Sequence, residues 1–359
     1  MSLLTERFHK VTPYTAGEQP ADKDIIKLNT NECPYPPSPK VTKALEQAAA
    51  DFADIRLYPD PDANELVSAI SERYGIRRDQ IFTGVGSDEV LALVFQTFFT
   101  GGGELLFPDI TYSFYKVWAE LYGIRYRTIA LDGQLCIRAD DYLDEAAAGC
   151  CGIIFPNPNA PTGRVMDTAD IERIVAAHPD CAVVVDEAYI DFGGVSVLPL
   201  IDKYENLLVV QTFSKSRAMA GMRVGFACGS KLLIDALKDV KFSFNSYTLN
   251  RISIRAGAAS MKDEEYFREC VDRIVSTREW FSQKLKDLGF EFCPSSTNFI
   301  FASHPGMRAA DIFEQLKRRK IYVRYFDLPR IDNYLRITVG TDEQMSILAN
   351  ALEEILGTC

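Results

Sequence analysis

Gln211-Thr-Phe-Ser-Lys215-Ser-Arg217, followed closely by Arg223, is the stretch of this sequence that points most directly to its fold. A lysine flanked by small hydroxyl residues, with an arginine eight positions on, suits a Schiff-base lysine beside a phosphate-binding group of side chains. Upstream, the apolar run Ala182-Val-Val-Val185 ends in Asp186-Glu-Ala-Tyr189. This run predicts a buried strand that carries a carboxylate and a phenol at its carboxyl end.

The lysine at 215 and the carboxylate at the end of the predicted strand together indicate pyridoxal phosphate as a cofactor. The aldehyde of this cofactor needs an amine, which Lys215 would supply, and its pyridinium nitrogen needs an anionic partner such as Asp186. Of two nucleotide-binding alternatives, the sequence disfavours a dinucleotide site and excludes a P-loop. A dinucleotide fingerprint would need glycine where Glu89 stands in Gly84-Val-Gly-Ser-Asp-Glu89, and a P-loop would need a Gly-Lys pair, which the chain lacks.

The composition is that of an ordinary globular protein. The chain has 359 residues, of which 47% are apolar and 25% charged, and its net charge of -11 disfavours a nucleic-acid partner. With neither a long apolar span nor a basic leader, we expect a cytoplasmic protein without a membrane partner. The nine cysteines form no CxxC pair and predict reduced thiols. With three histidines and no HExxH motif, we expect no metal site.

Alternating strands and helices fill the middle of the chain. Apolar runs predict seven strands, at 81–83, 104–107, 125–130, 151–155, 181–186, 207–212 and 224–227. Helical patterns precede or separate most of them, at 39–52, 63–74, 87–99, 111–122, 140–148, 167–177 and 230–240. The fold class is therefore α/β, with a mainly parallel seven-stranded sheet flanked by helices. No helix separates the last two strands, so one of them is expected to be antiparallel.

After residue 245 the pattern changes to a smaller α+β region. Its predicted helices lie at 248–260, 263–288, 308–319 and 341–356, and its strands at 298–302, 321–325 and 334–339. We expect an N-terminal arm over residues 1–40 that joins the small domain, a large cofactor-binding domain over 41–260 and a small C-terminal domain over 261–359.

Several single features have both a structural and a functional interpretation. The glycine turn 84–89 between a strand and a helix suits an anion, but such a turn often only reverses the chain. Asn157, in a proline-rich loop after a strand, is either a turn former or a donor to a cofactor oxygen. Tyr112 either stacks on a planar cofactor or belongs to the core. Arg336, and less sharply Arg324, either binds an anionic substrate or forms an internal ion pair.

These segments, in this order, resemble the fold-type I pyridoxal-phosphate aminotransferases and, more narrowly, the histidinol-phosphate aminotransferase family. The resemblance covers almost the whole chain, from Asn29-Thr-Asn-Glu-Cys-Pro34 to Leu335-Arg-Ile-Thr-Val-Gly340. The segments around Lys215 and Asp186 are jointly its most specific part. It implies transamination of L-histidinol phosphate with 2-oxoglutarate, giving imidazole acetol phosphate and glutamate, as a step of histidine biosynthesis.

The resemblance also implies a role for each matching residue. Lys215 would bond to the cofactor and move the substrate's α-proton, while Asp186 would pair with the ring nitrogen. Asn157 and Tyr189 would donate to the ring oxygen, and Tyr112 would stack on the ring. The residues expected at the cofactor phosphate are Ser87, Asp88, Thr212, Ser214, Arg223 and, from the neighbouring subunit of a homodimer, Tyr58. The residues expected at the substrate are Tyr14, Asn29, Asn31, Glu32, Arg324 and Arg336.

The sequence departs from the family pattern at a few positions, and other functions stay open. Val85 stands where asparagine is usual, and Asp191 stands where glutamate is frequent. Both positions bear on the identity of the substrate. A threonine-phosphate decarboxylase or an aromatic amino-acid aminotransferase would use the same cofactor and scaffold. A ligand-sensing domain of a regulator would need an attached DNA-binding module and no reactive lysine.

Overall fold

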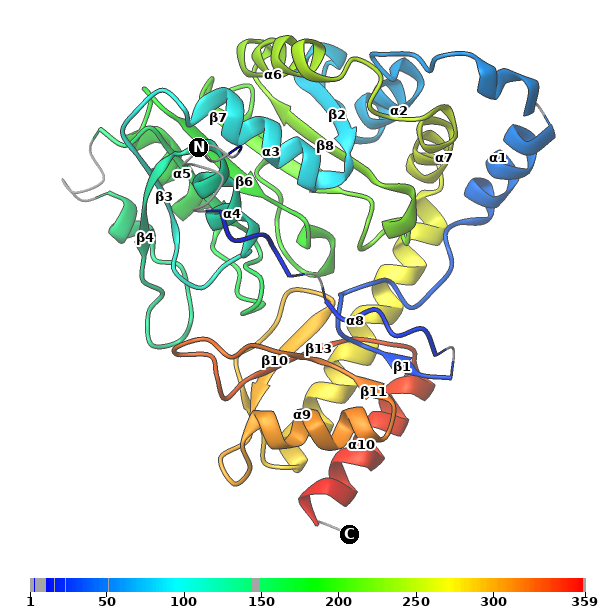
Figure 1. Cartoon of the computed structure of the whole chain (residues 1–359), viewed down its shortest axis with the longest axis vertical. Coiled ribbons are helices and arrows are strands. Elements are labelled where there is room, and N and C mark those ends of the chain that lie inside the picture. The colour runs from blue at the N-terminus through cyan, green and yellow to red at the C-terminus, as the bar shows by residue number, and fades with distance from the viewer. Residues whose placement is uncertain are drawn as a thin grey trace.

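A seven-stranded, a four-stranded and a two-stranded β-sheet, with the helices around them, make up the molecule, which we describe from a computed structural model (Figure 1). The structure describes residues 3, 11–15, 17–22, 24–50, 52–143 and 149–357. We call the seven-stranded sheet with its helices the large domain, and the four-stranded sheet with its helices the small domain. The part of the chain that the structure describes contains no helix that is both long and apolar enough to cross a membrane.

The seven-stranded sheet has the order β2-β8-β7-β6-β5-β3-β4. Its strands are β2 Ile81–Val85, β3 Glu104–Pro108, β4 Arg125–Ile129, β5 Gly152–Pro156, β6 Ala182–Asp186, β7 Leu207–Thr212 and β8 Val224–Gly229. β8 pairs antiparallel with both of its neighbours, and the other pairs are parallel. The predicted seven strands, and the antiparallel member among the last two, are confirmed.

Helices cover both faces of this sheet because its strands are apolar on both sides. Leu66 of α2, Ile171 of α5 and Ile254 of α7 pack in the core on one face. Val90 of α3, Trp118 of α4 and Ile234 of α6 pack in the core on the other. The helices of the large domain are α1 Pro39–Ala50, α2 Asn64–Tyr74, α3 Gly86–Phe98, α4 Phe114–Tyr122, α5 Thr168–Ala177, α6 Lys231–Phe244 and α7 Arg251–Met261.

The small domain lies at the bottom of Figure 1 and has its own core. Its four-stranded sheet has the order β12-β13-β10-β9, with β9 Glu291–Phe292, β10 Phe299–Ser303, β12 Arg324–Tyr325 and β13 Leu335–Thr338. α9 Ala309–Arg318 and α10 Asp342–Leu356 pack on it. α8 Glu264–Asp287 runs from the large domain into this core.

The N-terminal arm joins the small domain through a strand that the sequence does not predict. β1 Ile26–Lys27 pairs in parallel with β11 Ile321–Tyr322, and Leu28 enters the small core. The two-residue β9 is also unpredicted, because so short a strand has no periodicity to detect. The expected helix at 140–148 is a 3₁₀ turn at Ala139–Tyr142, and 144–148 lie outside the described residues.

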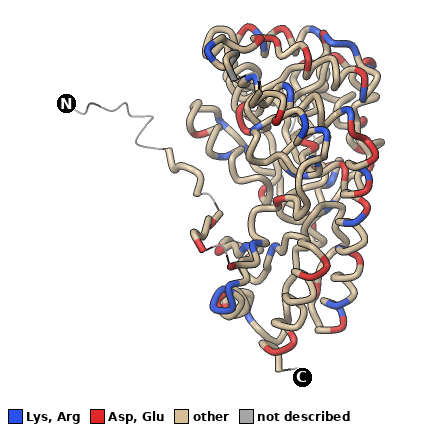
Figure 2. Tube along the Cα trace, turned by 90° about the vertical axis from the view of Figure 1, so that its right-hand side faces the viewer, with Lys and Arg blue, Asp and Glu red and all other residues tan. Residues whose placement is uncertain are grey.

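Charged residues are mixed along the chain: Figure 2 shows acidic and basic positions alternating over the helices. The eight described cysteines are free thiols, as predicted, although six of them are only partly buried. Cys359 lies outside the described residues.

Candidate functional site

The predicted site residues meet at one edge of the large sheet. Asp186 ends β6, Thr212 ends β7 and Asn157 follows β5, so all three lie where parallel strands finish. β8 runs the other way, and its first residue therefore lies at the same edge, paired with Val85 of β2. Ligands of α/β proteins bind outside this carboxyl edge because loops of several strands converge there.

Asp186 is a buried carboxylate with few protein partners. Its Oδ2 accepts a hydrogen bond from the Tyr115 hydroxyl at 2.9 Å, and its Oδ1 accepts one from the Ala188 N–H at 3.1 Å. Burial raises the pKa of Asp186 to about 6. The same burial, with Asp186 beside it, raises the pKa of Tyr115 well above its usual value, so this phenol stays a donor. The carboxylate lacks a cation at contact distance among the described residues, and a bound cationic group would favour its charged form.

Glu187, the next residue, is also a buried carboxylate, but it accepts more hydrogen bonds from the protein than Asp186 does. Its carboxylate accepts hydrogen bonds from the Ser196 hydroxyl, the Val197 N–H and the Gln211 amide, at 2.6, 2.8 and 2.8 Å. Burial raises the pKa of Glu187 to about 7. Three donors from the protein satisfy this carboxylate, so its role is to join β6 to neighbouring segments.

A narrow anion-binding turn lies at the start of α3. Gly86 opens the helix at φ +74°, and a Cβ there would lie 2.5 Å from Arg223 Nη2. A Cβ on Gly225 would lie 2.3 Å from the Ser87 backbone nitrogen. Both glycines are therefore needed to bring β8, Arg223 and the helix N-terminus together. The free N–H groups and positive dipole of that terminus favour an anion.

Side chains around this turn orient Arg223. Asp88 Oδ2 accepts from Arg223 Nη2 at 2.8 Å, and Asp88 Oδ1 accepts from the Tyr112 hydroxyl at 2.7 Å. The Asp88 carboxylate thus positions the arginine, which leaves the backbone N–H of Asp88 as the group that could donate to an anion. On the neighbouring strand, the Thr212 hydroxyl donates to Ser214 Oγ at 3.0 Å, and both hydroxyls are buried.

The N-terminal arm lies between two cationic side chains. Lys215 Nζ donates to the Thr30 carbonyl at 3.2 Å, and Arg336 Nη2 donates to the Asn29 carbonyl at 3.1 Å. Two consecutive carbonyls of the arm therefore connect the predicted reactive lysine of the large domain to the predicted substrate arginine of the small domain.

Asn31 fixes this part of the arm. Its amide donates to the Tyr189 hydroxyl at 2.8 Å, and its Oδ1 accepts from the Thr338 hydroxyl at 3.0 Å. Its backbone has φ 55°, a conformation that asparagine tolerates better than most residues. Its carbonyl accepts from the Asn298 amide at 3.0 Å. Asn31 thus joins the phenol of the large domain to β13 of the small domain and to Asn298, the residue before β10.

Arg336 retains unused hydrogen-bonding capacity. Its Nε is buried without a hydrogen-bond partner among the described residues, and so is the Asn29 Oδ1. Arg336 faces Arg324 directly across β12 and β13. Burial, and then the neighbouring charge of Arg324, lower the pKa of Arg336. Two cationic groups side by side with an unpaired donor are suited to a carboxylate or phosphate.

Aromatic rings form one wall beside these groups. Tyr14 stacks on Phe114 with ring centroids 4.2 Å apart, and Phe114 lies 5.5 Å from Tyr112. Burial raises the pKa of Tyr112 well above its usual value, so its hydroxyl remains a donor to Asp88. Tyr112 precedes α4 rather than lying within the helix predicted at 111–122.

Three further predicted residues are placed as follows. Asn157 exchanges hydrogen bonds with the backbone of Met166, which leaves one amide N–H free for another acceptor. Glu32 pairs with Lys27; burial alone would raise the pKa of Glu32, but the ammonium group outweighs burial and lowers it. Tyr58 is 77% exposed and stacks on Tyr247, away from the groups described above.

Sequence reasoning missed three contributors to the site. Tyr115, which donates to Asp186, lies three residues after Tyr112, and that helical spacing was a usable signal. Thr338 and Asn298 hold Asn31 from the small domain. No local pattern identifies them, because their partner is roughly three hundred residues away in the chain.

Comparison with known proteins shows which sequences this chain resembles. Residues 23–352 match the family described as aminotransferase class I and II. A histidinol-phosphate aminotransferase of Aromatoleum aromaticum is 53% identical over 348 residues, which cover 97% of each chain.

Solved structures show the same fold. The histidinol-phosphate aminotransferase of Sinorhizobium meliloti, in complex with pyridoxal-5'-phosphate, has a TM-score of 0.88 at 24% identity and covers 100% of this chain and 98% of its own. The L-threonine-O-3-phosphate decarboxylase of Porphyromonas gingivalis has a TM-score of 0.78 at 22% identity, covering 93% and 100%. At these identities the likeness shows the fold alone.

Proposed function

This chain belongs to the class I and II aminotransferase family, and from that premise we propose that it transaminates L-histidinol phosphate with 2-oxoglutarate, using pyridoxal 5'-phosphate. The 53% identity to a curated histidinol-phosphate aminotransferase over nearly the full length supports this reaction. The structural observation that carries it is the pair of consecutive arm carbonyls between Lys215 and Arg336. A reactive amine and a site for an anionic substrate group are thereby adjacent.

The residues present fit this cofactor. A side chain on Gly86 would collide with Arg223, and one on Gly225 would collide with the Ser87 backbone. Glycine at both positions therefore lets Arg223 and the N-terminus of α3 lie close together, as donors to one phosphate must. Asp186 is a buried carboxylate without a cation in contact, which is the partner that a pyridinium nitrogen needs. The donors for the phosphate would be Arg223, Thr212, Ser214 and the N–H groups of Ser87 and Asp88, and Tyr112 would cover the ring.

The chain's own residues would carry out the proton and binding steps. The bound cofactor supplies an electron-withdrawing ring for the bond that breaks at the amino-bearing carbon. Lys215 Nζ would take the proton from that carbon and return it on the cofactor side. Tyr189, held by Asn31, and the free amide N–H of Asn157 would donate to the ring oxygen. Arg336 and Arg324 would bind the phosphate of histidinol phosphate in one half-reaction and a carboxylate of 2-oxoglutarate in the other.

Absorption spectra of the cofactor, recorded for each half-reaction separately, test the proposal. The cofactor-loaded protein is mixed with L-histidinol phosphate alone, and the aldehyde-form absorption of the cofactor should give way to the amine form. Addition of 2-oxoglutarate should reverse this change. If the aldehyde form persists with histidinol phosphate but is converted by an aromatic amino acid, the substrate assignment is wrong. Release of carbon dioxide from threonine phosphate would identify a decarboxylase instead.

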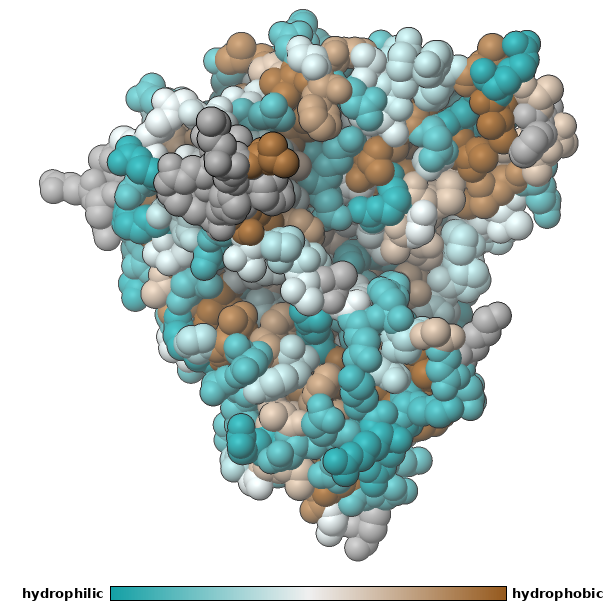
Figure 3. Space-filling view, in the orientation of Figure 1, coloured by the Kyte–Doolittle hydropathy of each residue, from teal (hydrophilic) through white to brown (hydrophobic). Residues whose placement is uncertain are grey.

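We further propose a homodimer whose subunits share their sites, working in the cytoplasm. Tyr58 is exposed beside the similarly exposed Ile55, Leu57, Tyr247 and Phe244. Figure 3 shows hydrophobic side chains gathered at the upper right, over the corner between α1 and α2. An apolar surface of this kind favours a protein partner, and a second copy would bring Tyr58 to the neighbouring site. The free thiols suit a reducing compartment.

Mixing two defective variants tests the shared site. Tyr58→Ala and Lys215→Ala each impair one half of a composite site, so mixed dimers would contain one intact site. After subunit exchange, activity should approach about a quarter of the wild-type value, because about half of the dimers are mixed. If exchange is demonstrated and activity stays at the sum of the two variants, Tyr58 acts within its own subunit.

A further inference from the structure

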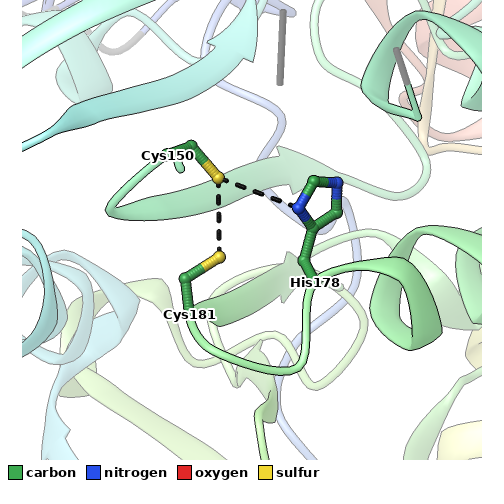
Figure 4. A group of neighbouring side chains, drawn as sticks. All are labelled: Cys150, His178 and Cys181. Carbon is green, nitrogen blue, oxygen red and sulfur yellow. Dashed lines mark hydrogen bonds between the residues drawn. The ribbon is translucent and has the colours of Figure 1, made fainter. Parts of the chain in front are cut away.

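A second cluster of reactive side chains lies at the opposite edge of the large sheet. Cys150 precedes β5, Cys181 precedes β6, and His178 follows α5 (Figure 4). Cys150 Sγ lies 3.5 Å from Cys181 Sγ and 4.0 Å from His178 Nδ1. All three potential ligand atoms lie within 4.8 Å of one another, and among the described residues no other group of three or more His, Cys, Asp and Glu side chains does so.

We propose that Cys150, His178 and Cys181 bind one thiophilic metal ion, with Zn²⁺ as the fitting species. In a tetrahedral zinc site, bonds of about 2.3 Å to sulfur and about 2.0 Å to nitrogen place two sulfurs about 3.8 Å apart and sulfur and nitrogen about 3.5 Å apart. The observed sulfur–sulfur distance of 3.5 Å and sulfur–nitrogen distance of 4.0 Å lie within about half an ångström of this geometry, so small side-chain rotations would bring the ligands to an ion. Two thiolates and an imidazole also select zinc over the oxygen-seeking magnesium and calcium.

The histidine is oriented as a ligand. Its Nε2 lies 2.6 Å from the Tyr142 carbonyl, which can only accept, so Nε2 must carry the proton. In the neutral ring Nδ1 then carries a lone pair, and this nitrogen faces Cys150 Sγ (Figure 4). A backbone carbonyl that fixes the tautomer through the distal nitrogen is a common companion of metal-binding histidines.

The turn that carries two of the ligands is held in place. The Asn206 amide donates to the carbonyls of Val175, His178 and Cys181, at 3.1, 2.7 and 3.3 Å. Cys181 N–H in turn donates to the His178 carbonyl at 3.3 Å. The parallel pairing of β5 with β6, which matches Gly152 with Ala182, brings Cys150 alongside. A tetrahedral ion would complete its coordination with water, since the cluster is only partly buried.

Sequence spacing explains why no motif predicts this site. Cys150 lies 28 positions from His178 and 31 from Cys181, so the first ligand joins the others only through the sheet. The ion would link the entry of β5 to the turn between α5 and β6. The site is distinct from the cofactor site, because Asn157 and Asp186 lie at the far ends of the same two strands.

Metal retention tests the proposal. The cofactor-loaded protein, with thiols reduced, is incubated with Zn²⁺ or Co²⁺, and unbound metal is removed by gel filtration. We expect about one ion per chain, and for Co²⁺ the thiolate charge-transfer band and intense visible bands of a tetrahedral site. Cys150→Ser and Cys181→Ser should each lose both the ion and the thiolate band.

Two variants make the result specific. Cys151→Ser is the matched control, since Cys151 adjoins Cys150 but its thiol donates to the Phe99 carbonyl. It should retain the ion. His178→Gln, whose amide can still donate to the Tyr142 carbonyl, should weaken retention while keeping the fold. Cofactor absorbance and the melting temperature of the metal-free protein report folding for each variant. Wild-type protein without a retained ion, or unchanged retention in Cys181→Ser, would overturn the proposal.

Discussion

Strands β5 and β6 have different reactive residues at their carboxyl ends and at their amino ends. At the carboxyl edge, Asp186 accepts from Tyr115 of α4, and Asn31 of the arm donates to Tyr189 while Thr338 of the small domain holds it. At the amino edge, Cys150, His178 and Cys181 contact one another within a single βαβ unit. The first site is assembled from distant parts of the chain, and the second is local. A change at the carboxyl edge should therefore disturb catalysis, whereas a change at the amino edge should disturb only its surroundings.

Lys215→Ala is the largest expected disruption of the carboxyl edge. Without the amine, the proton at the substrate's reacting carbon has no carrier, and turnover should fall at least about a thousandfold. Steady-state assays with histidinol phosphate measure the loss, and Lys231→Ala, on the exposed surface of α6, serves as the control. Retained turnover would remove Lys215 from the mechanism. Metal retention at the amino edge should be unaffected.

Arg336→Ala should have the next largest effect. It removes a guanidinium that donates to Asn29 and has a buried unpartnered Nε. Loss of a charge-assisted contact costs about 2–4 kcal/mol, or about 30- to 900-fold in kcat/KM. Both histidinol phosphate and 2-oxoglutarate should be affected. Arg336→Lys should recover only part of the loss, because lysine cannot bind an anion through two parallel donors. A defect with neither substrate would make Arg336 structural.

Asp186→Asn should weaken cofactor binding and yet stabilise the cofactor-free protein. Because burial raises the pKa of Asp186 in the folded protein to about 6, from an ordinary aspartate value of 3.8, the folded state holds this proton more tightly than the unfolded state. The carboxylate therefore costs stability above pH 6, by up to about 3 kcal/mol, and little below pH 4. Urea unfolding of cofactor-free wild type and variant at pH 8 and pH 4 measures the difference. A variant that is less stable at pH 8 would contradict this account.

Cys150→Ser should have the smallest effect on catalysis. Its site shares β5 and β6 with the active site but no hydrogen bond with it among those described above, so kcat and KM should stay within about twofold of wild type. A stopped assay with both substrates, in metal-free buffer, suffices. A large change in KM for histidinol phosphate would mean that the two edges are coupled through the strands. The amino-edge site would then not be independent of the active site.

The large sheet was predictable because its strands are continuous apolar runs, such as Ala182–Asp186, and its helices alternate with them. The reactive groups were predictable where they follow such strands. The sequence did not show the pairings over long separations, β1 with β11 and Thr338 with Asn31, nor the shorter-range contact of Cys150 with His178 across the sheet. Each depends on the completed fold, which brings together residues that share no local pattern.

The parallel pairing of β1 with β11 sets the order in which parts of the enzyme can fold during synthesis. Ile26 pairs with Ile321, so the arm docks only on a strand made near the end of synthesis. The large domain contains its own cores and can fold earlier as the chain emerges. Thr30 and Asn31, however, can meet Lys215 and Tyr189 only once the arm has docked. A ribosome-bound intermediate would thus have a formed sheet and an unfinished substrate site, and it would gain activity only when the last strands are released.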